Sequence, residues 1–116
     1  MNAPATEPLQ VESLGGGRFA LRGRLGYPTA RAALESGADL FADTQVIKVD
    51  LSGVTEADSA GLALLIEWVA WAREHHREMR FFDLPRQIRA IARICEVEDV
   101  LRAAERWEEA PAKRED

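Results

Sequence analysis

Two short apolar segments separated by a long helical pattern constrain the fold of this chain more than any other feature. Residues 46–51 (VIKVDL) are β-branched and apolar, as in an inner strand of a sheet, and residues 79–84 (MRFFDL) predict another strand. Residues 60–76, between them, have helical periodicity. A strand, a helix and a second strand in this order predict parallel pairing with a right-handed crossover. The chain is therefore expected to contain a parallel α/β unit.

The flanking segments extend this unit in both directions. Residues 9–14 and 18–24 predict a β-hairpin with a glycine turn, since the glycine run lacks the GK[ST] ending of a phosphate loop. A short first helix is predicted from Pro28, with Gly37 as its stop signal, and Pro85 opens a helix after the second strand. We expect an α/β fold with a mixed, mostly parallel sheet, an N-terminal hairpin and helices packed mainly on one face.

The length and the terminal segments indicate one domain. The chain has 116 residues, enough for a single hydrophobic core, and residues 98–109 predict a last amphipathic helix. We therefore expect one domain over residues 9–110, a flexible N-terminus over residues 1–8 and a charged C-terminal tail over residues 111–116.

Composition and charge exclude several classes of partner. The net charge of −5 argues against a surface that neutralises nucleic-acid phosphates. The longest apolar run, residues 60–72, is interrupted by Glu67 and is shorter than the about 20 residues that span a bilayer, so direct membrane insertion is not expected. Residues 1–8 carry no secretory signal, and a single cysteine cannot form an internal disulfide. These features predict a cytoplasmic protein.

Few side chains suggest catalysis or metal binding. His75 and His76 are adjacent and lack the spacing of a helical metal pair, so no metal site is expected. Cys95 falls on the apolar stripe of the helix after Pro85, which favours a small buried hydrophobic residue over a nucleophile. Asp50 and Asp58 lack a third group that would complete a catalytic set. We expect neither enzymatic activity nor a cofactor, although an enzyme that uses Cys95 or Asp58 stays a third hypothesis.

The turn that precedes the long helix carries the most specific signal. Asp58 and Ser59 are good N-cap residues at its start. The Ser59 hydroxyl is expected beside the unpaired N–H groups of the helix start, which favour anions and can accommodate a phosphate. Gly61, in the first turn, predicts close approach by a neighbour. Two roles stay open for Asp58 and Ser59: a cap of the helix, or a contact and switch point for a partner.

The long helix has two apolar stripes where a simple surface helix has one. The first is expected to face the sheet and consists of Leu62, Leu65, Ile66, Val69 and Ala72. The second lies almost opposite and consists of Leu64, Trp68, Trp71 and His75. Exposed tryptophans would form a docking surface. Alternatively, a neighbouring helix, or the terminal one with Trp107, covers them.

Residues 49–54 (VDLSGV) and 58–65 (DSAGLALL) resemble the signature of STAS domains, the family of anti-sigma factor antagonists. The order of the elements resembles that family over about residues 9–101. Within the family, residues 60–65 (AGLALL) are similar to the MlaB type, whose members bind the ATPase of the Mla phospholipid transporter. Antagonist members more often carry a second serine and a Gly-Leu-Gly run.

The resemblance implies a non-catalytic protein that docks onto the ATPase subunit (MlaF-like) of an ABC-type phospholipid transporter and stabilises or regulates it. Such a protein maintains outer-membrane lipid asymmetry and lies in the cytoplasm, peripheral to the inner membrane through its partner. The alternative is an anti-sigma factor antagonist that binds an anti-sigma factor and is switched by phosphorylation of Ser59. The expected partner-binding residues are Asp58, Ser59, Ala60, Leu62, Leu64, Trp68 and Trp71.

Overall fold

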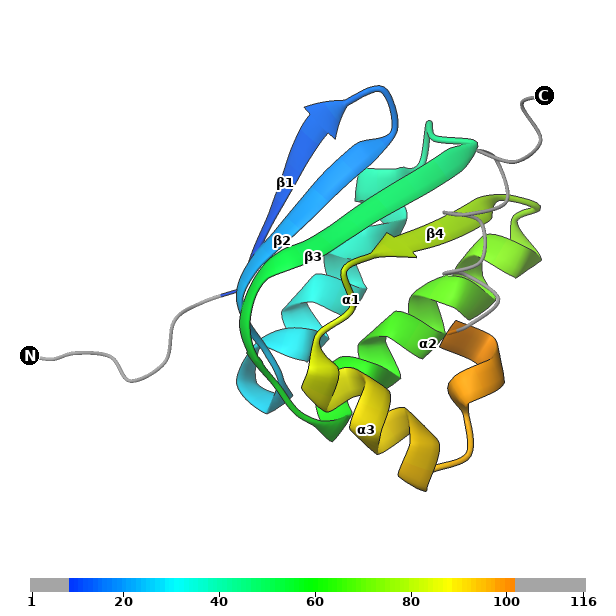
Figure 1. Ribbon diagram of the computed structural model, residues 1–116. Coiled ribbons are helices and arrows are strands. Elements are labelled where there is room, and N and C mark those ends of the chain that lie inside the picture. The colour runs from blue at the N-terminus through cyan, green and yellow to red at the C-terminus, as the bar shows by residue number, and fades with distance from the viewer. Residues whose placement is uncertain (1–8, 102–116) are drawn as a thin grey trace, which may run out of the picture.

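The computed structural model describes residues 9–101 (Figure 1). The elements in this range are, in chain order, β1 (Gln10–Gly15), β2 (Arg18–Leu25), α1 (Tyr27–Phe41), β3 (Val46–Ala57), α2 (Ser59–Glu74), β4 (Glu78–Phe82) and α3 (Arg86–Ile94). A further helical segment begins at residue 98. Trp107 and the predicted C-terminal tail lie outside the described residues, as does the predicted flexible N-terminus.

The sheet is mixed, with the strand order β1-β2-β3-β4. β1 and β2 pair antiparallel across the glycine turn, where Gly16 has a φ of 63° that suits glycine. The β2–β3 and β3–β4 pairs are both parallel, and Val49 lies between Phe19 and Phe81 in neighbouring strands. The predicted hairpin and the mostly parallel sheet are therefore confirmed.

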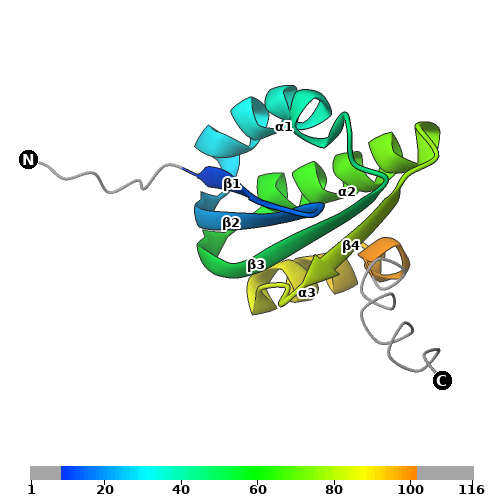
Figure 2. The ribbon, with the colours of Figure 1, turned by 90° about the horizontal axis from the view of Figure 1, so that it is seen from above.

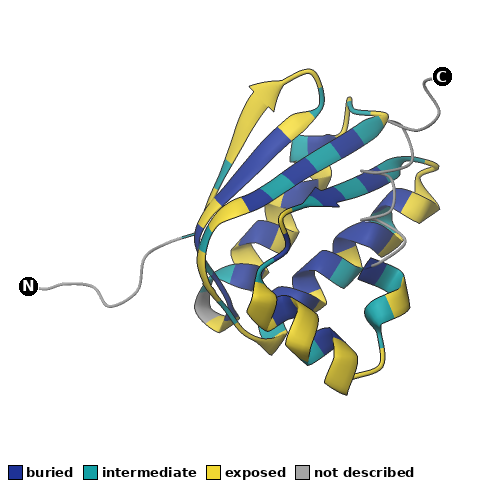
Figure 3. Ribbon diagram, in the orientation of Figure 1, coloured by how far each residue is buried: buried dark blue, intermediate teal, exposed yellow. Residues whose placement is uncertain are grey.

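The helices lie mainly on one face of the sheet. α1 and α2 pack side by side over that face, and α3 packs against α2 and β3 (Figure 2). Along residues 46–51 of β3, half-buried and buried residues alternate, because successive side chains point to opposite faces (Figure 3). Ile47, Val49 and Leu51 point to the helices and are at most 1% exposed. The core therefore lies between the sheet and α1 and α2.

β3 is longer than the apolar run that predicted it. Residues 52–57, expected to form the loop before the long helix, continue the strand and pair with the second half of β2. Gly53 is opposite Arg22, and Ala57 is opposite Leu25. The backbone ladder with β2 maintains the strand here, although residues 52–57 (SGVTEA) have little of the apolar character of its first half.

α1 does not stop at Gly37, as predicted, but continues to Phe41. Gly37 is buried against the Trp68 indole, and a Cβ atom at this position would lie 2.6 Å from Trp68 Nε1. A glycine fits here because it lets α1 approach α2 closely. The expectation for Gly37 is therefore wrong, and its role is packing.

Cys95 is exposed, which contradicts the prediction that it is a small buried hydrophobic residue. α3 ends at Ile94, which is itself 80% exposed, and Glu96 has a φ of 61°. The chain turns away before the apolar stripe of Ile88 and Ala92 reaches Cys95.

A candidate docking surface at the start of helix α2

Asp58 is the residue that caps α2. Its backbone is extended, with φ −136° and ψ −169°, and its Oδ1 accepts hydrogen bonds from the N–H groups of Ala60 (2.9 Å) and Gly61 (3.2 Å). Ser59 is the first residue of the helix and is exposed. Of the roles considered for this pair, capping belongs to Asp58, and the Ser59 side chain faces solvent.

Gly61 lies against the end of β2. A Cβ atom at this position would collide with the carbonyl oxygen of Leu25. The N–H of Asp58 also donates to this oxygen, over 3.2 Å. The close neighbour that the glycine predicted is therefore a backbone group of the same chain, which holds the first turn of α2 on the sheet.

The second apolar stripe of α2 is mostly covered. Leu64 and Trp68 are each 2% exposed, and Leu62, on the first stripe, is 4% exposed. Phe41, at the end of α1, packs edge-to-face on Trp68, with 5.1 Å between the ring centroids. The prediction that Leu62, Leu64 and Trp68 lie on an exposed docking surface is thus wrong. Leu64 and Trp68 belong to the core because α1 reaches far enough to cover the second stripe, whereas Leu62 is buried on the first stripe.

Trp71 is half-buried at the other end of α2 from Ser59. Its ring stacks on His75, with 4.3 Å between centroids, and the Arg77 guanidinium lies 5.4 Å from its centroid. Arg77 also donates to the carbonyl oxygens of Phe41 (2.8 Å) and Thr44 (3.0 Å). At about 1.5 Å per residue, Trp71 lies about 18 Å along the helix from Ser59. The structure therefore does not bring Trp71 and Ser59 into one patch.

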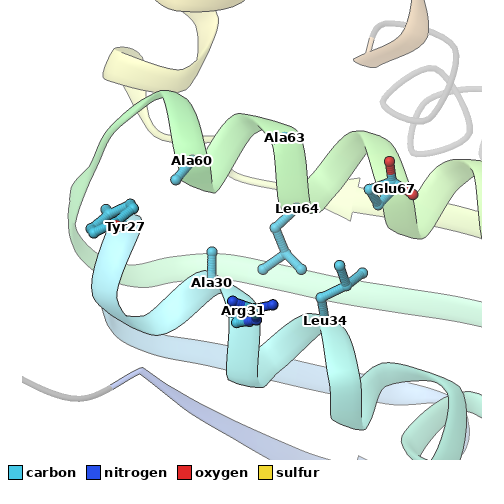
Figure 4. Close-up of a pocket in the computed structure, with 8 residues that line it drawn as sticks. All are labelled: Tyr27, Ala30, Arg31, Leu34, Ala60, Ala63, Leu64 and Glu67. Atoms are coloured by element: carbon cyan, nitrogen blue, oxygen red, sulfur yellow. The ribbon is translucent and has the colours of Figure 1, made fainter.

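A groove between α1 and α2 instead begins at Ala60, the residue after Ser59. Its volume is about 580 Å³, within the range of ligand-binding clefts. The residues that line it are Tyr27, Ala30, Arg31, Leu34, Ala60, Ala63, Leu64 and Glu67 (Figure 4). Tyr27 and Ala60 lie at one end and Leu34 and Glu67 towards the other. Tyr27 is 80% exposed and Leu34 is 42% exposed.

Only Ala60 and Leu64 of this groove were among the predicted site residues. Tyr27 and Leu34 were missed, although a spacing of about two turns places them on one side of α1. Small residues line the facing sides, Ala30 on α1 and Ala60 and Ala63 on α2. Local periodicity carries no signal for the groove, because the exposure of Tyr27 and the small residues opposite it depend on how α1 packs against α2.

Neither a metal centre nor a membrane-spanning helix is found in the described part of the chain. Within residues 9–101, no group of three or more His, Cys, Asp or Glu side chains could hold a metal ion. None of the helices in this range is long and apolar enough to cross a bilayer.

Comparison with known proteins identifies the family. The family model for the MlaB-type STAS domain matches residues 10–103, whereas none of the curated proteins compared with the chain matches it. The anti-sigma factor antagonist SpoIIAA, in its unphosphorylated form, has a similar solved structure with a TM-score of 0.56 and 15% identity, and the match covers 72% of this chain and 79% of that one.

A second similar structure is that of a sulfate transporter family protein from Wolinella succinogenes. Its TM-score is 0.60 at 16% identity, with 79% of this chain and 75% of that chain covered. At such identities both structures show a shared fold and nothing finer. Because the family model covers most of the sequence, the chain belongs to the STAS domain family and is of the MlaB type.

Proposed function

We propose that this protein is a non-catalytic subunit that binds the MlaF-like ATPase of an ABC-type phospholipid transporter and stabilises or regulates it. The docking surface consists of Ser59, Ala60 and Ala63 of α2 and Tyr27 and Leu34 of α1. In this role the protein lies in the cytoplasm, at the inner membrane through its partner, and supports outer-membrane lipid asymmetry. Membership of the MlaB-type STAS family supports this partner.

The observation that carries the proposal is the apolar groove that is lined by Ala60, the residue that follows the exposed Ser59. An exposed tyrosine next to small apolar residues is typical of an interface, because the ring offers a large contact area and loses little conformational freedom. A groove between two helices fits the apolar side of a partner helix. Binding would change the ATPase if the protein has different affinities for two of its conformations.

Capture of the ATPase by the tagged chain tests this function. The full chain is co-expressed with the MlaF-type ATPase of the same organism, and the ATPase that co-purifies is quantified. Ser59→Glu adds a charge beside the groove, and Tyr27→Ala removes the exposed ring; each is expected to reduce capture at least about tenfold, as loss of an interface hot spot does. Circular dichroism should stay native. Unchanged capture by both variants would contradict the proposal.

A second candidate function, an anti-sigma factor antagonist, is favoured by one observation. Ser59 is exposed at a helix start, in a fold shared with the antagonist SpoIIAA. A phosphate on Ser59 would add about −1.5 to −2 charges, favoured by the helix start and disfavoured by Asp58. Incubation with ATP and a cognate anti-sigma kinase tests this function. Labelling of the wild-type chain but not of Ser59→Ala supports it, and an unlabelled wild-type chain counts against it.

A further inference from the structure

One carboxylate joins the starts of the two helices that form the groove. Oδ1 of Asp58 accepts the N–H groups of Ala60 and Gly61 in α2, and Oδ2 accepts the N–H of Tyr27 in α1, over 3.2 Å. Each oxygen therefore serves a different helix. Tyr27 and Ala60, whose N–H groups both donate to Asp58, lie at the same end of the groove (Figure 4).

The start of α1 provides no side-chain acceptor of its own for the N–H of Tyr27. Its N-cap is Gly26, which has no side chain, and its first turn contains no acidic residue. Thr29 Oγ1 accepts the N–H of Gly26, over 3.3 Å, so the hydroxyl of the first turn serves a different donor. The N–H of Tyr27 belongs to the helix-start donors that need an external partner, and a negative charge is favourable there.

The residue at position 26 leaves room for this contact. A Cβ atom on Gly26 would lie 2.7 Å from Asp58 Oδ2 and 2.9 Å from its Cγ. The carboxylate of Asp58 thus lies directly against the backbone of Gly26. A larger residue at this position would displace the carboxylate and separate the two helix starts.

We propose that Asp58 is a positioning residue of the docking surface, which fixes the backbone of Tyr27 relative to Ser59 by holding the first turns of α1 and α2 together. This inference rests on the proposed function, since it concerns the same surface. Tyr27 is 80% exposed, so few packing contacts hold it, and the anchoring of its backbone sets the point from which the ring extends. Asp58 acts through Tyr27 and need not itself touch the partner.

Two substitutions separate the link to α1 from the cap of α2. Asp58→Asn has the same shape but only one acceptor oxygen, so an oxygen turned to α2 leaves an NH₂ group facing the N–H of Tyr27. Asp58→Ser is an equally good N-cap, but its side chain has one short hydroxyl and does not reach both helices. Asp39→Asn removes a charge from an exposed residue of α1 and is the matched control.

The side chain of Tyr27 can be observed directly because it is the single tyrosine of the chain. The full chain is labelled with 3-fluorotyrosine, and its one ¹⁹F resonance is recorded without a partner. We expect both Asp58 variants to move this resonance by more than its linewidth and to weaken capture of the MlaF-type ATPase about fivefold, as loss of one hydrogen bond does. Asp39→Asn should change neither measurement.

The outcomes separate this inference from the proposed function. An unmoved ¹⁹F resonance in both Asp58 variants overturns the positioning role, whatever the capture experiment shows. A moved resonance with unchanged capture also overturns it, because the docking surface then does not depend on where Tyr27 is held. Failure of the wild-type chain to capture the ATPase contradicts the proposed function, whereas the ¹⁹F result still reports on the junction itself.

Discussion

The two ends of the α1–α2 pair differ although the same two helices form both. Near the start of α2, Ala60 and Ala63 leave a groove open to solvent. Near its end, Trp68 and Phe41 fill the space between the helices, and Trp68 is 2% exposed. The size of the side chains therefore decides where this helix pair offers a surface. A smaller side chain at the closed end, where Trp68 and Phe41 lie, should therefore affect stability. A larger side chain at the open end, where Ala60 and Ala63 lie, should affect binding.

The largest effect is expected at the closed end. Trp68→Ala should lower the free energy of unfolding by about 3–5 kcal/mol, because it removes a fully buried aromatic side chain and leaves a cavity. Trp71→Ala, at a half-buried position, should cost about 1–2 kcal/mol. Urea unfolding followed by circular dichroism measures both variants. An equal decrease in the free energy of unfolding for both variants would show that Trp68 is not more deeply buried than Trp71.

Gly37→Ala tests the same contact from the side of α1. Helix propensity alone predicts that the free energy of unfolding rises by about 1 kcal/mol. Overpacking against Trp68 predicts that it falls by about 1–3 kcal/mol. We expect the loss to prevail, because the indole is buried and has little room to move. Ser36→Ala, at an exposed position of the same helix, should instead raise the melting temperature slightly. A higher melting temperature for Gly37→Ala would contradict the packing role.

At the open end, the expected effect is on binding. Ala63→Arg places a long charged side chain in the groove and should weaken capture of the MlaF-type ATPase about tenfold, while stability changes by less than about 0.5 kcal/mol because Ala63 is exposed. Ala70→Arg is the control, since Ala70 is exposed about two turns further along α2 and does not line the groove. Equal loss of capture by both variants would show that the groove is not the contact.

The smallest effect is expected at the start of α2. Ser59→Ala should change the free energy of unfolding by less than about 0.5 kcal/mol, because Asp58 caps the helix. Asp58→Ala should cost about 1 kcal/mol. Thermal unfolding of the two variants compares them. A loss for Ser59→Ala as large as that for Asp58→Ala would mean that the serine hydroxyl also stabilises the helix start.

The strands and helices with strong apolar patterns could be predicted from the sequence. Residues 46–51 form a short apolar run with β-branched side chains, and the structure places them in β3. Where a tertiary contact determines how far a strand or helix extends, the apolar pattern does not predict its end. Residues 52–57 stay extended because they pair with β2, and Gly37 stays helical because it packs on Trp68. Such partners are distant in sequence, so local periodicity does not reveal them.

The site was predictable in part for the same reason. The exposure of Ser59 follows from its place at a helix start, which is a local property, and the structure confirms it. The burial of Trp68 does not follow from local properties, since periodicity shows that a helix has two apolar stripes but not which helix covers the second. The groove requires the packing of α1 against α2, and therefore Tyr27 and Leu34 could not be assigned from spacing alone.

The contact between Gly61 and the Leu25 carbonyl has a consequence for how a partner recognises this protein. Since the backbone of the helix start lies directly against the strand end and is hydrogen-bonded to it, this part of the surface is already in place before a complex forms. Association then loses little conformational entropy on this side. A chemical group attached at Ser59 would alter the local charge and leave the architecture beneath it unchanged.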